Sequence, residues 1–115
     1  MYKLYGISNC DTVKKARAFL EQHGIPVNFI DFKKSPLSEV ELLRWKEAFA
    51  DYPVNIKGAT YKKHKDEFET LDPKSKIQFL KEHTSMIKRP ILEEEGVVLA
   101  FGFDEQSYLG LFNVR

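Results

Sequence analysis

The sequence predicts an α/β fold, a four-stranded mixed sheet with flanking helices and a helical insertion between a β-α-β half and a β-β-α half. Three observations lead to it: a strand, helix and strand pattern opens the chain, helical patterns fill the middle, and two short β-prone runs come near the end. A length of 115 residues suits one domain. We therefore expect a single domain over residues 1–115, with the insertion at about 35–86.

The opening pattern consists of two β-prone segments joined by one helix. Residues 2–6 alternate large apolar side chains with others and end at a glycine, which predicts a strand. From Thr12 to His23 apolar residues recur at helical spacing, and a glycine and a proline follow. Residues 27–32 are rich in valine, phenylalanine and isoleucine. Because a single helix connects the two strands, they should lie parallel.

The middle of the chain is predicted to be helical. Ser38 and Glu41 have the spacing of a capping box, so a helix should run from there to about Ala50. Residues 51–61 read as irregular, and a lysine-rich segment and residues 72–83 read as further helices. The apolar face of the capped helix is expected to consist of Val40, Leu43 and Phe49.

Two β-prone runs near the end of the chain predict an antiparallel hairpin. They span residues 90–93 and 97–101. Glu93, Glu94 and Glu95 are interpreted as its charged turn, and a short helix should begin at Asp104.

Charge and hydropathy exclude some classes of function. The formal net charge of +1 gives no field that would draw the protein to nucleic acid or to an anionic membrane. No run of about 18 apolar residues occurs, and the first residues do not form a basic segment followed by an apolar one. We expect a cytoplasmic protein without nucleic acid or membrane partners.

Cys10 is the one cysteine of the chain, so it cannot form an internal disulfide or a multi-cysteine zinc site. It follows the first strand and precedes a helix, whose amino-terminal N–H groups favour a thiolate. Lys14 adds positive charge near this end, whereas Asp11 opposes it. Position favours a reactive cysteine over the alternative, a buried and inert one.

Other polar residues carry weaker signals. Arg89 precedes Pro90 at the start of the third strand, where it could bind an oxyanion or could equally be an ordinary surface arginine. Lys57 alone reads as a solvated loop lysine. The histidines stand far apart in the sequence, so surface or capping roles are expected and no metal site is predicted; they are His23, His64 and His83.

Four segments together resemble the ArsC/Spx family, and most of all its YffB-like branch. They are residues 6–16, 55–60, 87–92 and 102–103. The resemblance spans nearly the whole chain in the right order. It implies a thioredoxin-like fold with a helical insertion, in agreement with the element order above.

The resemblance also implies a glutathione-dependent thiol reductase. Cys10 matches the family cysteine that attacks the oxidised substrate, after which glutathione resolves the adduct and glutaredoxin reduces the mixed disulfide. Arg89 matches the arginine that binds the oxyanion, and Pro90 matches a proline with a cis peptide bond. No bound cofactor is expected. The predicted substrate- or anion-binding residues are Arg89, Lys57, Asp11, Thr12 and Lys14.

Departures from the family pattern bear on the substrate. Lys57 stands where a second family arginine is expected, Gly102 lies where a third would be, and Gly6 replaces a histidine that arsenate reductases carry four residues before the cysteine. We therefore do not expect arsenate to be the physiological substrate.

The family's Spx branch supplies an alternative function. Spx proteins are transcription regulators that bind the α subunit of RNA polymerase without catalytic turnover, and many carry a Cys-x-x-Cys switch. Val13 occupies the second cysteine position here, which favours the reductase. We expect the protein to be a monomer.

Overall fold

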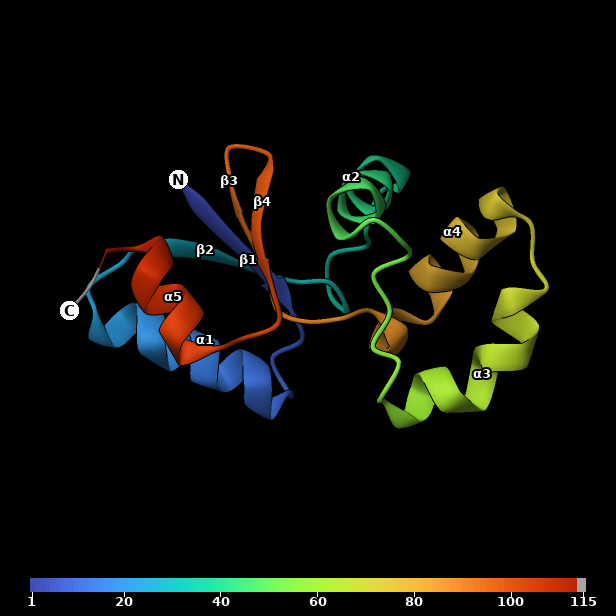
Figure 1. The fold of residues 1–115 in the computed structure, drawn as a ribbon, viewed down its shortest axis with the longest axis horizontal. Coiled ribbons are helices and arrows are strands. Elements are labelled where there is room, and N and C mark those ends of the chain that lie inside the picture. Colours follow the sequence, from blue (N-terminus) through green and yellow to red (C-terminus); the bar gives the residue numbers. More distant parts are fainter. Residues whose placement is uncertain (114–115) are drawn as a thin grey trace. The chain divides into compact units, whose positions relative to one another are not determined.

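The computed structural model describes residues 1–113, and the chain separates into two compact units: residues 1–34 together with the chain from Arg89 onward, and Ser35–Lys88. The second unit corresponds to the predicted insertion. The organisation of residues 1–115 as a single domain stays a prediction. Figure 1 labels the elements of both units.

The first unit contains the sheet and two helices. Its elements are β1 (Tyr2–Gly6), α1 (Asp11–Gln22), β2 (Val27–Asp31), β3 (Ile91–Glu94), β4 (Val97–Phe101) and α5 (Glu105–Leu111). The strand order is β2-β1-β3-β4. The β1 and β2 strands are parallel, whereas β1–β3 and β3–β4 are antiparallel. This is the predicted four-stranded mixed sheet with β-α-β and β-β-α halves.

Both helices of the first unit pack on the same face of the sheet. Leu4 in β1 and Leu92 in β3 are partners in register and both are fully buried. Phe19 of α1 and Tyr108 of α5 join the same cluster, with their rings edge to face at 5.6 Å between centroids. Figure 1 shows α1 and α5 side by side next to the strands. Apolar burial from both ends of the chain therefore holds this unit together.

Gly6 allows β1 and α1 to approach closely. A Cβ built on Gly6 would lie 2.8 Å from Cγ2 of Val13 and 3.2 Å from its Cγ1. Val13 is fully buried and its branched side chain has few alternative rotamers. Any side chain at position 6 would therefore push the end of the strand away from the helix.

The second unit begins with the predicted capping box. The Ser38 side chain accepts from the Glu41 N–H, and the Glu41 carboxylate accepts from the Ser38 N–H, at the start of α2 (Glu39–Phe49). The predicted apolar face was wrong: Val40 and Leu43 are 69% and 46% exposed, whereas Leu42 and Trp45 are fully buried. Both sets fit helical spacing, and burying tryptophan removes more apolar surface from water.

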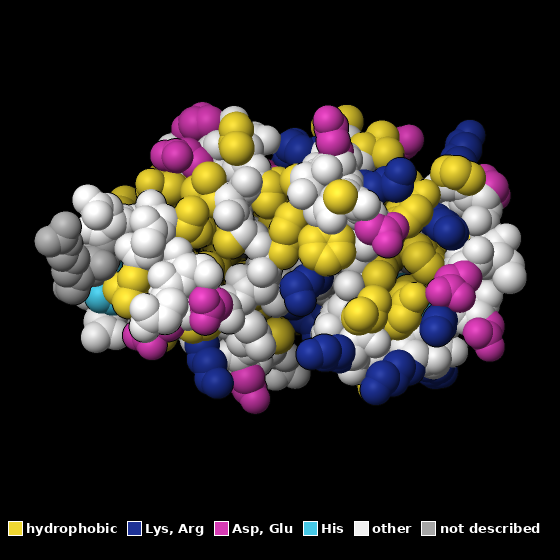
Figure 2. Space-filling model, viewed as in Figure 1, with side chains coloured by type: hydrophobic (Ala, Val, Ile, Leu, Met, Phe, Trp, Pro, Cys, Tyr) yellow, Lys and Arg dark blue, Asp and Glu magenta, His cyan; other side chains and the backbone are white. Residues whose placement is uncertain are grey.

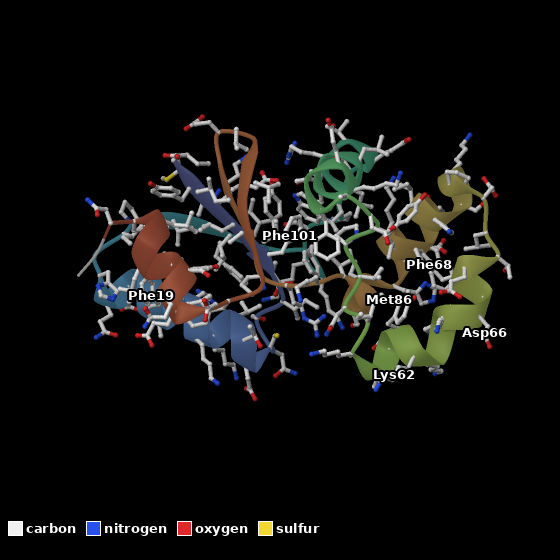
Figure 3. All side chains as sticks on the ribbon, in the orientation of Figure 1. Phe19, Lys62, Asp66, Phe68, Met86 and Phe101 are labelled. Atoms are coloured by element: carbon white, nitrogen blue, oxygen red, sulfur yellow. The ribbon has the colours of Figure 1, made fainter. Side chains whose placement is uncertain are left out.

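Two further helices and a short 3-10 helix complete the second unit. They are α3 (Ala59–Glu69), α4 (Pro73–Glu82) and η1 (Thr84–Met86). Asp72 caps α4 by accepting from the Ser75 N–H. Phe68 and Met86 are among the buried residues, whereas Lys62 and Asp66 lie on the exposed side of α3 (Figure 3). The lysine-rich segment is thus a solvated helix face.

The hairpin has a tighter turn than the sequence predicts. Glu94 pairs with Val97, so only Glu95 and Gly96 lie between the strands, with φ values of 50° and 79°. A two-residue turn of positive φ extends the strands on either side. Glu93 is consequently a strand residue and only 1% exposed, not part of an exposed charged turn.

We predict that Leu42→Ala and Leu43→Ala will separate the two faces of α2. Leu42→Ala should lower the free energy of unfolding by about 2–5 kcal/mol because it leaves a cavity in packed surroundings. Leu43→Ala should change it by less than about 0.5 kcal/mol. Urea denaturation of both variants measures this, and equal losses would contradict the assignment of faces.

A second pair of substitutions tests the contact at Gly6. Gly6→Ala should destabilise the protein by about 1–3 kcal/mol, because the added methyl group meets Val13. Gly110→Ala is the control, since nothing lies within 4 Å of a Cβ at this position in α5. There alanine should stabilise the helix by about 0.5–1 kcal/mol. Thermal unfolding that shows Gly6→Ala to be as stable as the native chain would refute the close approach.

Candidate active site around Cys10

Cys10 lies between β1 and α1, as the sequence predicts, and the helix begins one residue earlier than expected, so that Cys10 is its N-cap. Its backbone is extended, with φ −141° and ψ 124°, and its carbonyl accepts the first helical hydrogen bond from the Lys14 N–H at 2.9 Å. The side chain is partly exposed and makes no capping hydrogen bond with the described residues. The thiol is thus held at a helix end and can be reached from solvent.

The first turn of α1 offers backbone donors beside this thiol. Because helical bonding starts at Lys14, the N–H groups of the three residues before it have no acceptor within the helix. Together with the helix dipole they favour an anion at this end. Asp11, Thr12 and Lys14 have exposed side chains on this turn, whereas Val13 points into the core.

Asp31 anchors the loop that carries Cys10, a role that the sequence analysis missed. Its Oδ2 accepts from the Ser8 N–H at 3.2 Å, and its Oδ1 accepts from the Lys33 N–H at 2.9 Å. Asp31 ends β2 and is in register with Gly6, the last residue of β1. The signal was available, since parallel neighbouring strands deliver their carboxyl ends to one edge of the sheet.

The environment of Asp31 keeps it charged. Partial desolvation by itself raises the pKa of its carboxyl group, but hydrogen bonds from Lys33 and Ser8 and the charge of Lys34 outweigh it and bring the pKa below its ordinary value. The carboxylate therefore persists at neutral pH, and the anchor weakens only as the pH falls through this lowered pKa.

Arg89 and Pro90 lie at the same end of the sheet as Cys10. The peptide bond between them is cis, as predicted. Pro90 directly precedes β3, whose first residue, Ile91, pairs with Tyr5 near the end of β1. Topology thus brings the partly buried Arg89 toward the edge from which the cysteine loop starts. The direction of its guanidinium toward the sulfur stays a prediction.

Lys57 belongs to the second unit. It is exposed in a turn that the Gly58 N–H closes on the Asn55 carbonyl at 2.9 Å. Gly58 is confined there, since a Cβ would lie 2.9 Å from the Asn55 side chain. The approach of Lys57 to Cys10 stays a prediction.

The histidines are not all separate, contrary to the sequence analysis. His64 and His83 pack with 4.8 Å between ring centroids, because α3 and the end of α4 are neighbours in the second unit. His83 also stacks on Phe79 at 4.0 Å. Within residues 1–113, no group of three or more histidine, cysteine, aspartate or glutamate residues could hold a metal ion.

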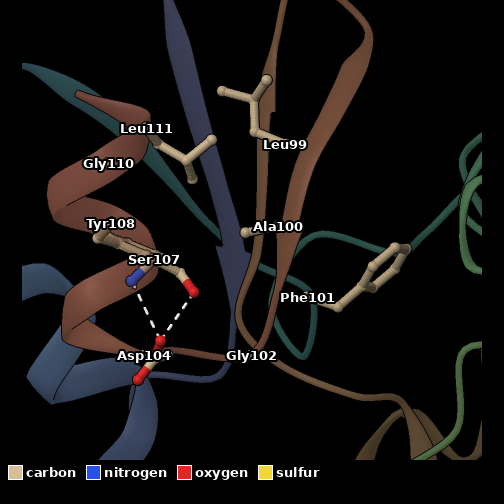
Figure 4. Close-up of a pocket in the computed structure, with 9 residues that line it drawn as sticks. All are labelled: Leu99, Ala100, Phe101, Gly102, Asp104, Ser107, Tyr108, Gly110 and Leu111. Atoms are coloured by element: carbon tan, nitrogen blue, oxygen red, sulfur yellow. Dashed lines mark hydrogen bonds between the residues drawn. The ribbon is translucent and has the colours of Figure 1, made fainter. Parts of the chain in front are cut away.

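A hollow of about 480 Å³ lies between β4 and α5 (Figure 4). Apolar side chains such as Leu99 and Leu111 line it, together with the Asp104 cap, whose Oδ2 accepts from the N–H and the hydroxyl group of Ser107. Its lining contains none of the predicted site residues.

Acidic and basic side chains both occur across the face shown in Figure 2, with apolar side chains between them. Among the helices described, none is long and apolar enough to cross a membrane.

Comparisons with known proteins match this arrangement. A solved structure of a protein named YFFB is 35% identical, with a TM-score of 0.80 over 96% of this chain and 97% of that one. An arsenate reductase (ArsC) related protein from Brucella melitensis is 36% identical, with a TM-score of 0.74 over 98% and 95%. The global transcriptional regulator Spx of Listeria innocua is 29% identical over 93% of this chain and 83% of its own length.

The family model covers nearly all of the described chain. A model described as the ArsC family matches residues 5–111, from β1 through the end of α5. The match includes the Cys10 loop, the insertion and the Arg89–Pro90 segment. The chain belongs to the ArsC family.

Proposed function

We propose that this protein is a cytoplasmic, monomeric thiol reductase that uses Cys10 as its nucleophile and glutathione as co-substrate. The observation that carries the proposal is the partly exposed thiol at the N-cap of the 12-residue helix α1. A thiolate is the attacking species in sulfur exchange, and a helix N-terminus favours it.

The reaction requires a thiol from outside the chain, because Cys10 has no second cysteine to resolve it. With a disulfide substrate, the Cys10 thiolate attacks one sulfur and releases the other as a thiolate. A first glutathione thiolate attacks the substrate sulfur that is bound to Cys10, which forms a glutathione–substrate disulfide and frees Cys10. A second glutathione thiolate then attacks the glutathione sulfur of that disulfide and releases the substrate as a thiol. Two glutathione molecules supply the two electrons and leave as glutathione disulfide. Glutaredoxin is an alternative second donor.

The remaining predicted residues would bind the negative charge of the substrate. The N–H groups of Asp11 and Thr12 and the ammonium group of Lys14 lie at the first turn, and Arg89 supplies a planar fork suited to an oxyanion or a carboxylate. Lys57 would add a point charge. No bound cofactor is part of this proposal.

The relatives support reductase chemistry but not arsenate in particular. The Brucella melitensis relative is named as related to arsenate reductase. In this chain Lys57 replaces a family arginine and therefore cannot form two parallel hydrogen bonds to an oxyanion. Gly6 has no side chain to offer, and its contact with Val13 leaves little room for one.

The Spx relatives favour a second candidate function, binding of the RNA polymerase α subunit without turnover. The chain lacks the second cysteine that an internal disulfide switch needs, and position 13 holds a buried valine. Association of the purified chain with RNA polymerase α, together with inert Cys10, would favour this second function over the reductase.

We predict that Cys10 forms a mixed disulfide with glutathione. Incubation with glutathione disulfide should add one glutathione per chain by intact mass, and Cys10→Ser should add none. Iodoacetamide should also alkylate Cys10 at pH 7 severalfold faster than N-acetylcysteine, because the helix end favours the thiolate. No adduct, combined with alkylation no faster than that of the free thiol, would show Cys10 to be inert.

Arsenate reduction by the native chain should be weak or absent in an assay with glutathione and glutaredoxin. Lys57→Arg restores the bidentate fork and should raise the rate by about tenfold. Lys63→Arg, at an exposed position of α3, is the control and should leave the rate unchanged. Turnover by the native chain equal to that of an arsenate reductase assayed beside it would contradict the prediction. A Lys57→Arg variant with an unchanged rate would show that Lys57 is not part of the site.

A further inference from the structure

We propose that Asp31 is a positioning residue for Cys10: its carboxylate tethers the loop between β1 and α1 and so fixes the cysteine at the helix end. The inference rests on the proposed function only in taking Cys10 as the reactive group. Asp31 does not touch the reacting atoms in this scheme. It acts through the backbone of Ser8, two residues before the cysteine.

The carboxylate joins the two chain segments that leave the sheet at this edge. One oxygen accepts from the Ser8 N–H, after β1, and the other accepts from the Lys33 N–H, after β2. Beside them the Phe32 N–H donates to the Gly6 carbonyl at 3.0 Å, which continues the parallel pairing by one step. Asp31 therefore extends the link between the strands into the cysteine loop.

Residues 6–10 are held at three points. Gly6 is fixed by the sheet, Ser8 by Asp31, and the Cys10 carbonyl by the Lys14 N–H. The Asp31 bond is the middle one, and it pairs a charged acceptor with a backbone donor. Without it the partly buried Ser8 N–H loses its acceptor, and the segment between sheet and helix becomes free to move.

Movement of this segment would take the sulfur away from the helix end. The N–H groups of the first turn act on an anion only over a short range. Cys10 benefits from them only while its backbone keeps the N-cap conformation of φ −141° and ψ 124°. A loosened loop would take the sulfur out of the range of these N–H groups and slow its attack on an electrophile.

Neutralisation of Asp31 should change the alkylation rate of Cys10 in opposite directions if Asp31 is a tether and if it is only a nearby negative charge. If Asp31 acted only as a negative charge near Cys10, its neutralisation would favour the thiolate and speed alkylation. If it acts as a tether, neutralisation slows alkylation. Asp31→Asn decides between the two, since asparagine has one oxygen acceptor for two N–H donors and places an NH2 group against the other donor.

The experiment compares the native chain, Asp31→Asn and Asp104→Asn. Asp104 is a matched control, because its carboxylate also accepts a backbone N–H, that of Ser107 at 3.1 Å, at the start of α5 in the same unit. Asp31→Asn should speed hydrogen exchange of the Ser8 amide by about tenfold and slow iodoacetamide alkylation at pH 7 by about fivefold. Asp104→Asn should leave both rates within about twofold of the native values.

Alkylation of Asp31→Asn at the native rate or faster would overturn the proposal, as would a drop of the same size in the Asp104→Asn control. Should Asp31→Asn fail to fold, hydrogen exchange of the native chain still decides, since a tethered Ser8 amide is protected and an unprotected one refutes the tether. Neither readout uses substrate or glutathione. A failure of reductase turnover is therefore distinguishable from a failure of the tether.

Discussion

The packing of α1 against the β1–β3 side of the sheet is the interaction on which the candidate site depends. Ala16, Phe19 and Leu20 are buried against Leu4 and Leu92, which fixes the direction of the helix relative to the strands. Since α1 follows β1 after a four-residue connection, its amino end must lie at the carboxyl end of β1. This packing therefore places Cys10 at the helix end and leaves it partly exposed.

The same edge of the sheet gathers the other polar groups of the first unit. Asp31 arrives there because β2 runs parallel to β1, and Arg89 arrives there because β3 runs antiparallel to it and begins where β1 ends. The mixed sheet thus brings the carboxyl ends of β1, β2 and β4 and the start of β3 to this edge. The two charged groups have different roles. The Asp31 carboxylate accepts hydrogen bonds from backbone N–H groups, whereas an arginine can bind a substrate anion.

Sequence alone was sufficient for features that depend on local pattern. The β-α-β opening, the Ser38–Glu41 capping box and the position of Cys10 between a strand and a helix all follow from short-range spacing, and all are present. Features that depend on tertiary packing were harder to predict from the sequence. Helical spacing fits both Val40 with Leu43 and Leu42 with Trp45, and only tertiary packing selects the second pair.

Long-range pairing explains what the sequence did not show about polar residues. His64 and His83 are 19 positions apart, yet the turn between α3 and α4 brings their rings together. Asp31 is separated from Ser8 by 23 positions, and only the parallel register of β1 and β2 makes them neighbours. The parallel direction of the two strands was predictable. Their register, which decides which side chain reaches Ser8, required the structure.

Position 13 links the fold to the kind of redox chemistry available. In α1 the third residue after the N-cap is Val13, which is fully buried and would contact a Cβ at Gly6. A cysteine at this position would replace a branched core side chain, and a larger residue at position 6 would collide with Val13. The two positions therefore constrain each other. Because Cys10 is the one cysteine of the chain, the proposed reductase would need a resolving sulfur from another molecule.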